Sequence, residues 1–209
     1  NNKTLLNNTI FDIATGDLNG DGYADLAVVG ENHTIATYHN NHSFGFRKHF
    51  VDIDNNKNYS RVALGDVDND GDLDMMTATW PNPVQNPTSL DLYLYENKGA
   101  GNFIGGGGVH KVDVGAAATY GFLFTITLRS GDFNNDGKAD FVLGISHNHP
   151  NHVGDGNPAR ATIFFLLNNG AGGYASTSTT IDTSNNQWGV LWIAAIQAKE
   201  ATGDNFDDV

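Results

Sequence analysis

The chain contains no cysteine, so disulfide bonds, thiolate metal sites and cysteine nucleophiles are all excluded. Long hydrophobic runs are also missing: WGVLWIAAI at 188–196 is far shorter than the roughly 18 residues that a membrane-spanning helix needs, and we expect no membrane insertion. Cationic residues are few, because 11 Lys and Arg stand against 24 Asp and Glu, giving a net charge of -13. This balance argues against nucleic acid as a partner and favours cations.

The first 60 residues give the indications of where the protein is located. It opens with NNKTLLNNTI, which reads as the middle of a longer protein rather than as a signal peptide. N-x-[ST] glycosylation motifs begin at Asn2, Asn7, Asn32, Asn41 and Asn58. Such motifs suit a secreted glycoprotein, so we expect an extracellular or cell-surface location.

Aspartate is concentrated in a repeated nine-residue motif. The stretch DVDNDGDLD at 66–74 has Asp at five of its nine positions, around Gly71. The pattern D-x-[DN]-x-D-G-x-x-D recurs as DLNGDGYAD at 17–25 and DFNNDGKAD at 132–140, and EATGDNFDD at 200–208 is a degenerate fourth copy. So much repulsion within one turn indicates that a bound cation offsets it.

Each motif lies between two short stretches with the β-branched and aromatic content of strands, such as FDIATG and LAVVG around the first copy. A third apolar stretch follows, then a Gly-rich turn closed by an aromatic residue, such as NKGAGNF at 97–103. Fourth strands are predicted at 48–54, 109–114 and 178–183. Four short strands per unit indicate an all-β protein, a β-propeller built from four-stranded antiparallel blades.

These loops and strands resemble the FG-GAP/VCBS repeat, the calcium-binding propeller blade of integrin α chains, fungal propeller lectins and bacterial secreted proteins that include some polysaccharide lyases. The resemblance covers nearly the whole chain. The Phe-Gly and Gly-Ala-Pro signature of integrin blades is not intact anywhere. The resemblance therefore lies in the metal loop and the strand pattern, and it does not imply integrin function.

The repeats divide residues 1–209, taken as part of one propeller domain, into units at roughly 10–54, 58–114 and 120–183 and a truncated unit at 188–209. Propellers close with about four to eight blades, whereas these units make about three and a half. We therefore expect a fragment of a longer propeller whose remaining blades come from the same longer chain. The alternative is that another chain supplies them.

The loop chemistry favours calcium. Calcium takes about six to eight oxygen ligands, and side chains at positions 1, 3 and 5 of a tight loop can turn toward one ion. Position 6 must bend the chain sharply, which glycine allows, while position 7 offers a carbonyl and position 9 a carboxylate. The expected side-chain ligands are Asp17, Asn19, Asp21 and Asp25; Asp66, Asp68, Asp70 and Asp74; and Asp132, Asn134, Asp136 and Asp140, with the carbonyls of Tyr23, Asp72 and Lys138.

The degenerate loop adds a fourth candidate calcium site with Glu200, Thr202, Asp204 and Asp208. An EF-hand is excluded, because it needs helices and a Glu at position 12, where this chain has Val28, Thr77 and Leu143. Magnesium fits less well, since it retains several waters. An acidic turn without metal is the alternative for any single copy, but three matching copies argue against it. We expect the ions to be structural.

Recognition is expected on the opposite face. In a four-stranded antiparallel blade the 1–2 and 3–4 connections emerge at one end, and the longer 2–3 and 4–1 connections emerge at the other. The candidate ligand-binding residues there are Trp80, Tyr120, His147, His149, His152, Arg160 and Trp188. Tyr120 and Trp188 could instead fill gaps between blades, and the histidines and Arg160 could be ordinary surface groups.

The sequence favours an extracellular recognition module that binds a glycan or a protein, with no catalytic residue predicted. A polysaccharide lyase is a second hypothesis, because His and Tyr side chains beside Arg160 would supply a base and a neutralising cation. A structural repeat of an extracellular assembly is the third. Resemblance to a repeat family indicates a fold more firmly than a function.

Overall fold

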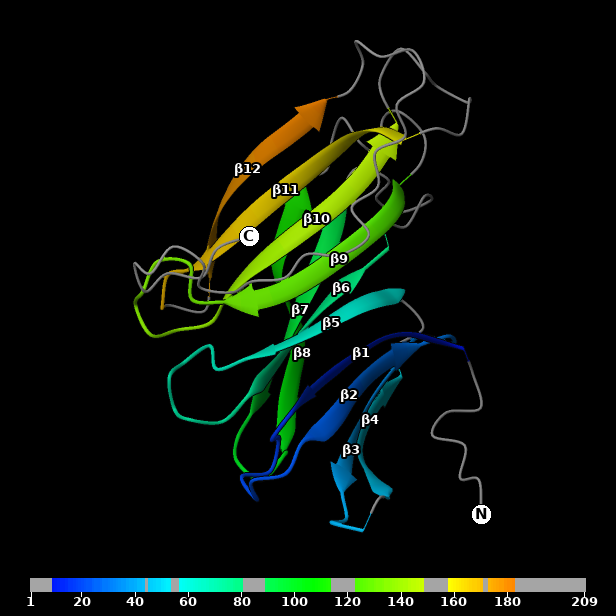
Figure 1. Cartoon of the computed structure of the whole chain (residues 1–209), viewed down its shortest axis with the longest axis vertical. Helices are drawn as coiled ribbons and strands as arrows, with labels where there is room; N and C mark the ends of the chain where they lie inside the picture. The colour runs from blue at the N-terminus through cyan, green and yellow to red at the C-terminus, as the bar shows by residue number, and fades with distance from the viewer. Residues whose placement is uncertain are drawn as a thin grey trace.

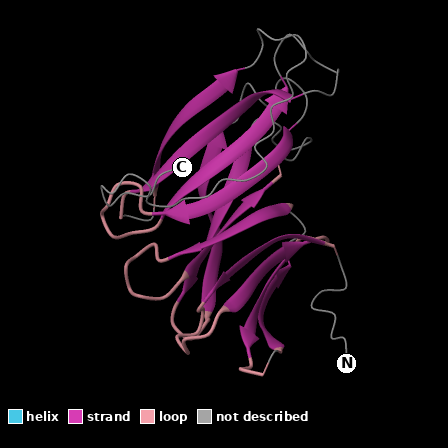
Figure 2. Ribbon diagram, viewed as in Figure 1, coloured by secondary structure: helices cyan, strands magenta, loops and turns pink. Residues whose placement is uncertain are grey.

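The computed structural model describes residues 9–43, 45–53, 57–80, 89–113, 123–148, 158–170 and 173–182. Every regular element in these ranges is a β-strand (Figure 2). In this part of the chain there is accordingly no helix with the length and apolar character needed to cross a membrane.

Twelve strands form three four-stranded antiparallel sheets, which we call blades 1 to 3 (Figure 1). Blade 1 contains β1 (Ile10–Gly16), β2 (Asp25–Gly30), β3 (Thr34–Asn40) and β4 (Phe46–Ile53). Blade 2 contains β5 (Tyr59–Gly65), β6 (Asp74–Thr79), β7 (Ser89–Asn97) and β8 (Phe103–Asp113). Blade 3 contains β9 (Leu123–Gly131), β10 (Asp140–Asn148), β11 (Pro158–Asn168) and β12 (Tyr174–Asp182). The predicted all-β fold of four-stranded antiparallel blades is confirmed.

The fourth strand of each blade begins earlier than the sequence predicted. These strands start at the aromatic residues Phe46, Phe103 and Tyr174, which close the preceding turns. The largest difference is in β8, where the glycines at 105–108 were left out of the strand predicted at 109–114. They continue the strand, because Gly105, Gly107 and Gly108 pair with β7 across two register shifts. Glycine suits such irregular pairing, since bulges need unusual backbone angles.

The core lies between neighbouring blades. One cluster joins blades 1 and 2 and includes Val29, Ile35, Val62 and Met75, and a second joins blades 2 and 3 and includes Met76, Leu92, Leu128 and Phe141. Strand β6 contributes Met75 to the first cluster and Met76 to the second, because successive side chains of a strand point to opposite faces. Blade 2 is therefore packed on both faces.

The first strands of the three blades lie side by side, with β5 in contact with β1 and β9. Asp12 of β1 accepts the main-chain N–H of Val62 at 3.2 Å. Arg61 of β5 donates its Nε–H to the carbonyl of Ile126 in β9. These side-chain bonds satisfy main-chain groups at the edges of neighbouring sheets, so they help to hold the blades in order.

Candidate metal loops and the opposite end of the blades

The three complete acidic motifs form the β1–β2, β5–β6 and β9–β10 connections, which we call loop 1 (17–25), loop 2 (66–74) and loop 3 (132–140). The carboxylate at position 1 accepts main-chain N–H groups from later residues of its own loop. In loop 1, Asp17 accepts from residues at positions 3 to 6 over 2.7–3.3 Å. Asp66 and Asp132 accept from positions 5 and 6 over 2.9–3.2 Å. The backbone of each loop therefore wraps around its first carboxylate.

Two further carboxylates fix the shape of each loop. The aspartate at position 5 accepts the N–H of position 7 at 2.9 Å in all three copies, Asp21, Asp70 and Asp136. The aspartate at position 9 is buried and accepts the N–H of position 2 at 2.9–3.1 Å, in Asp25, Asp74 and Asp140. Its other oxygen accepts the N–H of the asparagine that ends the third strand, at 2.7–2.8 Å. Position 9 therefore ties its loop to the middle of its blade.

The backbone turns at two positions in each loop, of which the sequence predicted one. The glycine at position 6 has a positive φ of 83° in Gly22, 94° in Gly71 and 83° in Gly137, as predicted. Position 4 also has a positive φ, of 76° in Gly20, 62° in Asn69 and 58° in Asn135. Glycine and asparagine are the residues that adopt this conformation most readily. Their alternation at position 4 was the signal that sequence reasoning missed.

Loop 2 has the densest negative charge. Ligand oxygens of Asp66, Asp68 and Asp74 all lie within 4.8 Å of one another. Burial raises the pKa of Asp74 to about 6, and repulsion from Asp68 and Asp70 adds to the rise. Burial, followed by repulsion from Asp70, also raises the pKa of Asp68. A divalent cation would reverse this penalty, and oxygen-only donors are the ligands that hard cations prefer, so the residues present fit such an ion.

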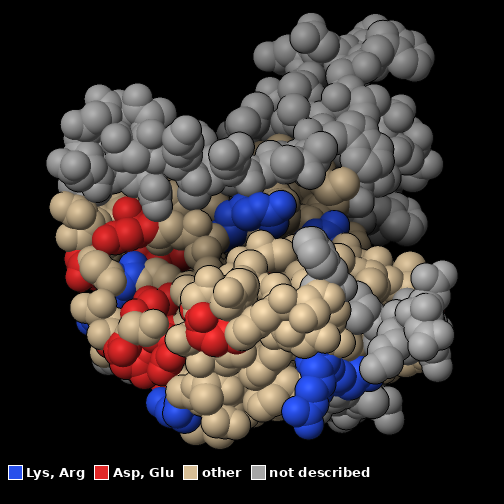
Figure 3. Space-filling model, turned by 60° about the horizontal axis from the view of Figure 1, so that its bottom comes forward, with Lys and Arg blue, Asp and Glu red and all other residues tan. Residues whose placement is uncertain are grey.

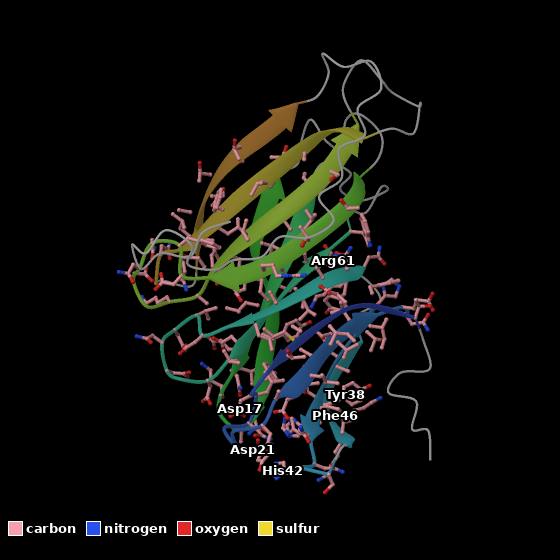
Figure 4. All side chains as sticks on the ribbon, viewed as in Figure 1. Asp17, Asp21, Tyr38, His42, Phe46 and Arg61 are labelled. Carbon is pink, nitrogen blue, oxygen red and sulfur yellow. The ribbon has the colours of Figure 1, made fainter. Side chains whose placement is uncertain are left out.

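Loop 1 has an additional partner from the β3–β4 turn. His42 Nε2 lies 2.8 Å from Asp21 Oδ2, and the His42 ring stacks on Tyr23 with 4.0 Å between ring centroids. This hydrogen bond lowers the pKa of Asp21. Figure 4 shows His42 beside Asp17 and Asp21 at the lower end of blade 1. Sequence reasoning did not single out His42, because its contact with loop 1 depends on how the two turns meet.

The acidic loops occupy one end of the blades. Figure 3 shows Asp and Glu side chains gathered at the left of the described surface, on the side where the β5–β6 and β9–β10 connections lie in Figure 1. The 3–4 turns emerge at the same end, as the blade topology predicted. This leaves the 2–3 and 4–1 connections at the opposite end.

At that opposite end, the structure places part of the predicted recognition surface. Trp80 follows β6, and its side chain is half-buried against the cluster between blades 2 and 3. The main-chain N–H of Trp80 donates to the Asn58 carbonyl at 2.8 Å. His147 in β10 and Arg160 in β11 are paired residues of one antiparallel ladder. The structure therefore brings the backbones of His147 and Arg160 together, while Trp80 contributes to packing.

A polar cluster between blades 1 and 2 was not predicted. The hydroxyls of Tyr59 and Tyr95 lie 2.5 Å apart, and Tyr95 donates to Asp52 Oδ2 at 2.6 Å. Both tyrosines are buried, and burial followed by the hydrogen bond to Asp52 raises the pKa of Tyr95. Tyr59 also packs in the apolar cluster between blades 1 and 2.

Several predicted site residues lie outside the described residues. They are the ligand candidates Tyr120, His149, His152 and Trp188, and the residues of the fourth loop, Glu200, Thr202, Asp204 and Asp208.

Comparison with known families agrees with the loop pattern. Residues 7–77 match the family model described as the FG-GAP-like repeat, and this match spans blade 1 with loop 1, strand β5 and the whole of loop 2. FG-GAP repeats are typical of extracellular proteins and often bind calcium. No curated protein matches the chain in a sequence comparison.

Proposed function

We propose that this chain, which carries an FG-GAP-like repeat, is an extracellular or cell-surface recognition module whose blades are stabilised by structural calcium. The observation that carries the proposal is the threefold recurrence of one loop structure. In all three copies, carboxylates at positions 1, 5 and 9 accept the same kinds of main-chain N–H donors. A single acidic turn would be weak support, but three equivalent turns built on one plan indicate a shared role.

The residues that would hold the ions are those at positions 1, 3, 5 and 9, together with the position 7 carbonyl. Loop 2 would offer four carboxylates, from Asp66, Asp68, Asp70 and Asp74, whereas loops 1 and 3 have asparagine at position 3. When bound, calcium supplies positive charge that offsets the repulsion within the loop. Hydrogen bonds within the chain fix the loop backbone around position 1 and connect the loop to the third strand through position 9.

The recognition role belongs to the opposite end of the blades. Binding residues are often found on loops that a rigid scaffold positions, and the 2–3 and 4–1 connections emerge there. The pairing of His147 with Arg160 places a titratable and a cationic residue on adjacent strands at that end. These residue types suit an acidic glycan or an acidic protein surface, because arginine pairs well with carboxylates.

Thermal unfolding of the 209-residue chain with calcium and with EDTA tests the metal. Ligand that binds only the folded state stabilises it by mass action, so we expect a clearly lower melting temperature in EDTA that added calcium restores. An EDTA melting curve that superimposes on the calcium curve would reject structural calcium. Mutating Asp66 and Asp74 together to Asn should remove most of the loop 2 contribution.

Binding to a panel of acidic and neutral glycans tests recognition, with detection of new unsaturated ends to report cleavage. Retention without cleavage supports a binding module. Cleavage that is lost in Arg160→Ala would favour the polysaccharide lyase instead, because His147 and Arg160 are paired. Failure to retain any glycan would direct the proposal toward a protein partner.

A further inference from the structure

The turn between the third and fourth strands is built in the same way in all three blades. The asparagine that ends the third strand accepts, through its side-chain oxygen, the main-chain N–H of the residue two positions later, at 2.9–3.1 Å. The acceptors are Asn40, Asn97 and Asn168, and the donors are His42, Gly99 and Gly170. The three donors are therefore equivalent residues, and we call the place they share the turn position.

Blade 1 has a histidine at the turn position, where blades 2 and 3 have glycine. The backbone has a positive φ there, of 60° in His42, 93° in Gly99 and 72° in Gly170. Glycine adopts such angles at no steric cost, whereas other residues do so uncommonly. Blade 1 therefore keeps a side chain at the turn position against the local backbone preference, which points to a role for the imidazole.

The turn position faces the acidic loop of its own blade. A Cβ on Gly99 would lie 3.7 Å from a carboxylate oxygen of Asp72, the position 7 residue of loop 2. In blade 1 a side chain is present, and the His42 ring stacks on Tyr23, the position 7 residue of loop 1, with 4.0 Å between ring centroids. A side chain at the turn position is thus directed at the expected metal ligands.

His42 occupies one oxygen of Asp21, the position 5 carboxylate of loop 1. Asp21 Oδ1 accepts the N–H of Tyr23 at 2.9 Å, and the equivalent bond recurs in loops 2 and 3. His42 Nε2 lies 2.8 Å from Asp21 Oδ2, the other oxygen (Figure 4). Because a carboxylate only accepts hydrogen bonds, Nε2 carries the hydrogen and donates it. In loop 3 the Oδ2 of Asp136 accepts instead from Asn134, which is itself an expected ligand of that loop.

We propose that His42 is a cap on loop 1 that calcium must displace, so that loop 1 fills last and exchanges its ion while loops 2 and 3 retain theirs. The proposal rests on the calcium role proposed above. A carboxylate oxygen that holds an N–H donor is a poorer ligand, because the donor draws on its negative charge and lies in the path of the ion. The N–H of Tyr23 is part of the loop backbone, whereas the His42 side chain is 47% exposed and can turn into water.

A ligand role for His42 fits the loop less well. The other side-chain donors expected in loop 1 are all oxygens, which calcium prefers, whereas imidazole suits zinc, copper and nickel. Among the described residues, the group of three His, Asp or Glu side chains that lie close enough to share an ion is in loop 2. His42 therefore does not complete a mixed nitrogen and oxygen site in loop 1.

Terbium(III) luminescence reports on loop 1 separately from the other loops. Terbium is a hard cation that takes the oxygen ligands that suit calcium, and it emits when a nearby aromatic ring absorbs ultraviolet light. Loop 1 has Tyr23 at position 7, where loops 2 and 3 have Asp72 and Lys138. Tyr23→Leu should remove most of the sensitised emission, which assigns the signal to loop 1. Displacing the terbium with calcium then measures the calcium affinity of this loop.

Two substitutions of His42 test the cap. His42→Phe keeps an aromatic ring beside Tyr23 but cannot donate a hydrogen bond, and His42→Gly restores the residue that blades 2 and 3 have. Both variants should bind calcium in loop 1 about tenfold more tightly, the ratio expected on losing one competing hydrogen bond to a charged group. His33→Phe is the matched control, because His33 also has a positive φ, of 58°, but lies in the β2–β3 turn at the other end of blade 1. It should leave the calcium affinity of loop 1 unchanged.

Calorimetric titration of the same samples counts the calcium ions that bind. Calcium binding at loops 2 and 3, with equal loop 1 affinities in the unmodified chain and both His42 variants, would overturn the cap alone. Weaker loop 1 binding in the His42 variants would also overturn it, because His42 would then help to hold the ion. Absence of calcium binding in every variant would reject the calcium role of the loops and the cap with it.

Discussion

The side-chain amide of Asn97 donates a hydrogen bond to the main-chain carbonyl of Leu18, 79 residues earlier in the chain, over 2.8 Å. The main-chain N–H of Asn97 donates to Asp74 Oδ1 at 2.8 Å, and the N–H of Leu18 donates to Asp25 Oδ2 at 3.1 Å. One asparagine therefore connects the position 9 aspartates of loops 1 and 2. Asn168 makes the equivalent connection between loops 2 and 3 through Val67 and Asp140.

Replacing Asn97 with Ala should weaken both the fold and its response to calcium. The change removes three side-chain hydrogen bonds, two donated to the carbonyls of Leu18 and Leu73 and one accepted from the N–H of Gly99. It leaves the carbonyl of Leu18 without this donor, which should lower the free energy of unfolding by about 1–3 kcal/mol. Because loops 1 and 2 lose their connection, the stabilisation gained on adding calcium should also fall. Urea denaturation with and without calcium measures both effects.

Asn102→Ala is the matched control for Asn97. Asn102 lies in the adjacent β7–β8 turn and is exposed, and its side chain donates only locally, to Gly99 at 2.8 Å. Removing the Asn102 side chain should leave the stabilisation gained on adding calcium unchanged. If Asn97→Ala lowers stability equally with and without calcium, the asparagine is a packing element and does not couple the loops.

The contact between Asn97 and Leu18 is a feature that could not be predicted from the sequence. The acidic loops, the flanking strands and the glycine at position 6 were predictable, because each depends on neighbouring residues and recurs with a fixed spacing. The contact between Asn97 and Leu18 depends on how two blades pack, which no local pattern records. The early start of β8 was missed for a related reason, since the glycines at 105–108 join the strand only through pairing with β7.

In the candidate site, too, the features set by neighbouring residues were predictable and the contacts between separate turns were not. Ligand types at positions 1, 3, 5 and 9 can be read from the motif, and the position 4 turn could have been read from the recurrence of Gly20, Asn69 and Asn135. The contact of His42 with Asp21 could not, because it joins two turns of blade 1 that are far apart in sequence. The candidate recognition residues stay a prediction, since irregular loops carry no spacing rule.

Tyr95→Phe should destabilise the interface between blades 1 and 2. The Tyr95 hydroxyl is buried and donates to Asp52 at 2.6 Å, so its removal deprives a half-buried carboxylate of a donor. We expect a loss of about 1–3 kcal/mol in the free energy of unfolding. Tyr93→Phe is the control, because the Tyr93 hydroxyl lies 3.5 Å from Asp91, too long for a strong hydrogen bond. Similar losses in the two variants would contradict a special role for the Tyr95 hydroxyl.

The metal-free protein should become less stable as pH rises. Burial raises the pKa of Asp74 from 3.8 to about 6, so the folded state binds this proton more tightly than the unfolded state does. The resulting stability is fully present below about pH 4 and is lost as pH rises through about 6. Asp140 and Asp68 shift in the same direction, chiefly through burial, while exposed Asp21 shifts in the opposite direction.

Urea denaturation of EDTA-treated protein between about pH 4 and pH 7 measures this dependence. Added calcium should reverse the trend, because the ion binds the ionised carboxylates. Asp74→Asn should flatten the metal-free profile, since it removes the group with the highest of the raised aspartate pKa values. Metal-free stability that increases steadily across this range would show that Asp74 ionises without cost.

The three loops should bind calcium with unequal affinity, in the order of their charge. Loop 2 has Asp68 at position 3, where loops 1 and 3 have Asn19 and Asn134. The number of charged ligands is one of the features that tune calcium affinity, so loop 2 should be the tightest site. Asp68→Asn should lower its affinity toward that of the other two, and the reciprocal Asn134→Asp should raise the affinity of loop 3. Calorimetric titration resolves these classes of sites.

Because the hydrogen-bonded backbone is nearly the same in all three loops, opposite effects of the two substitutions would identify carboxylate number as the determinant of calcium affinity. Unchanged affinities in both variants would show that the loop backbone determines calcium affinity.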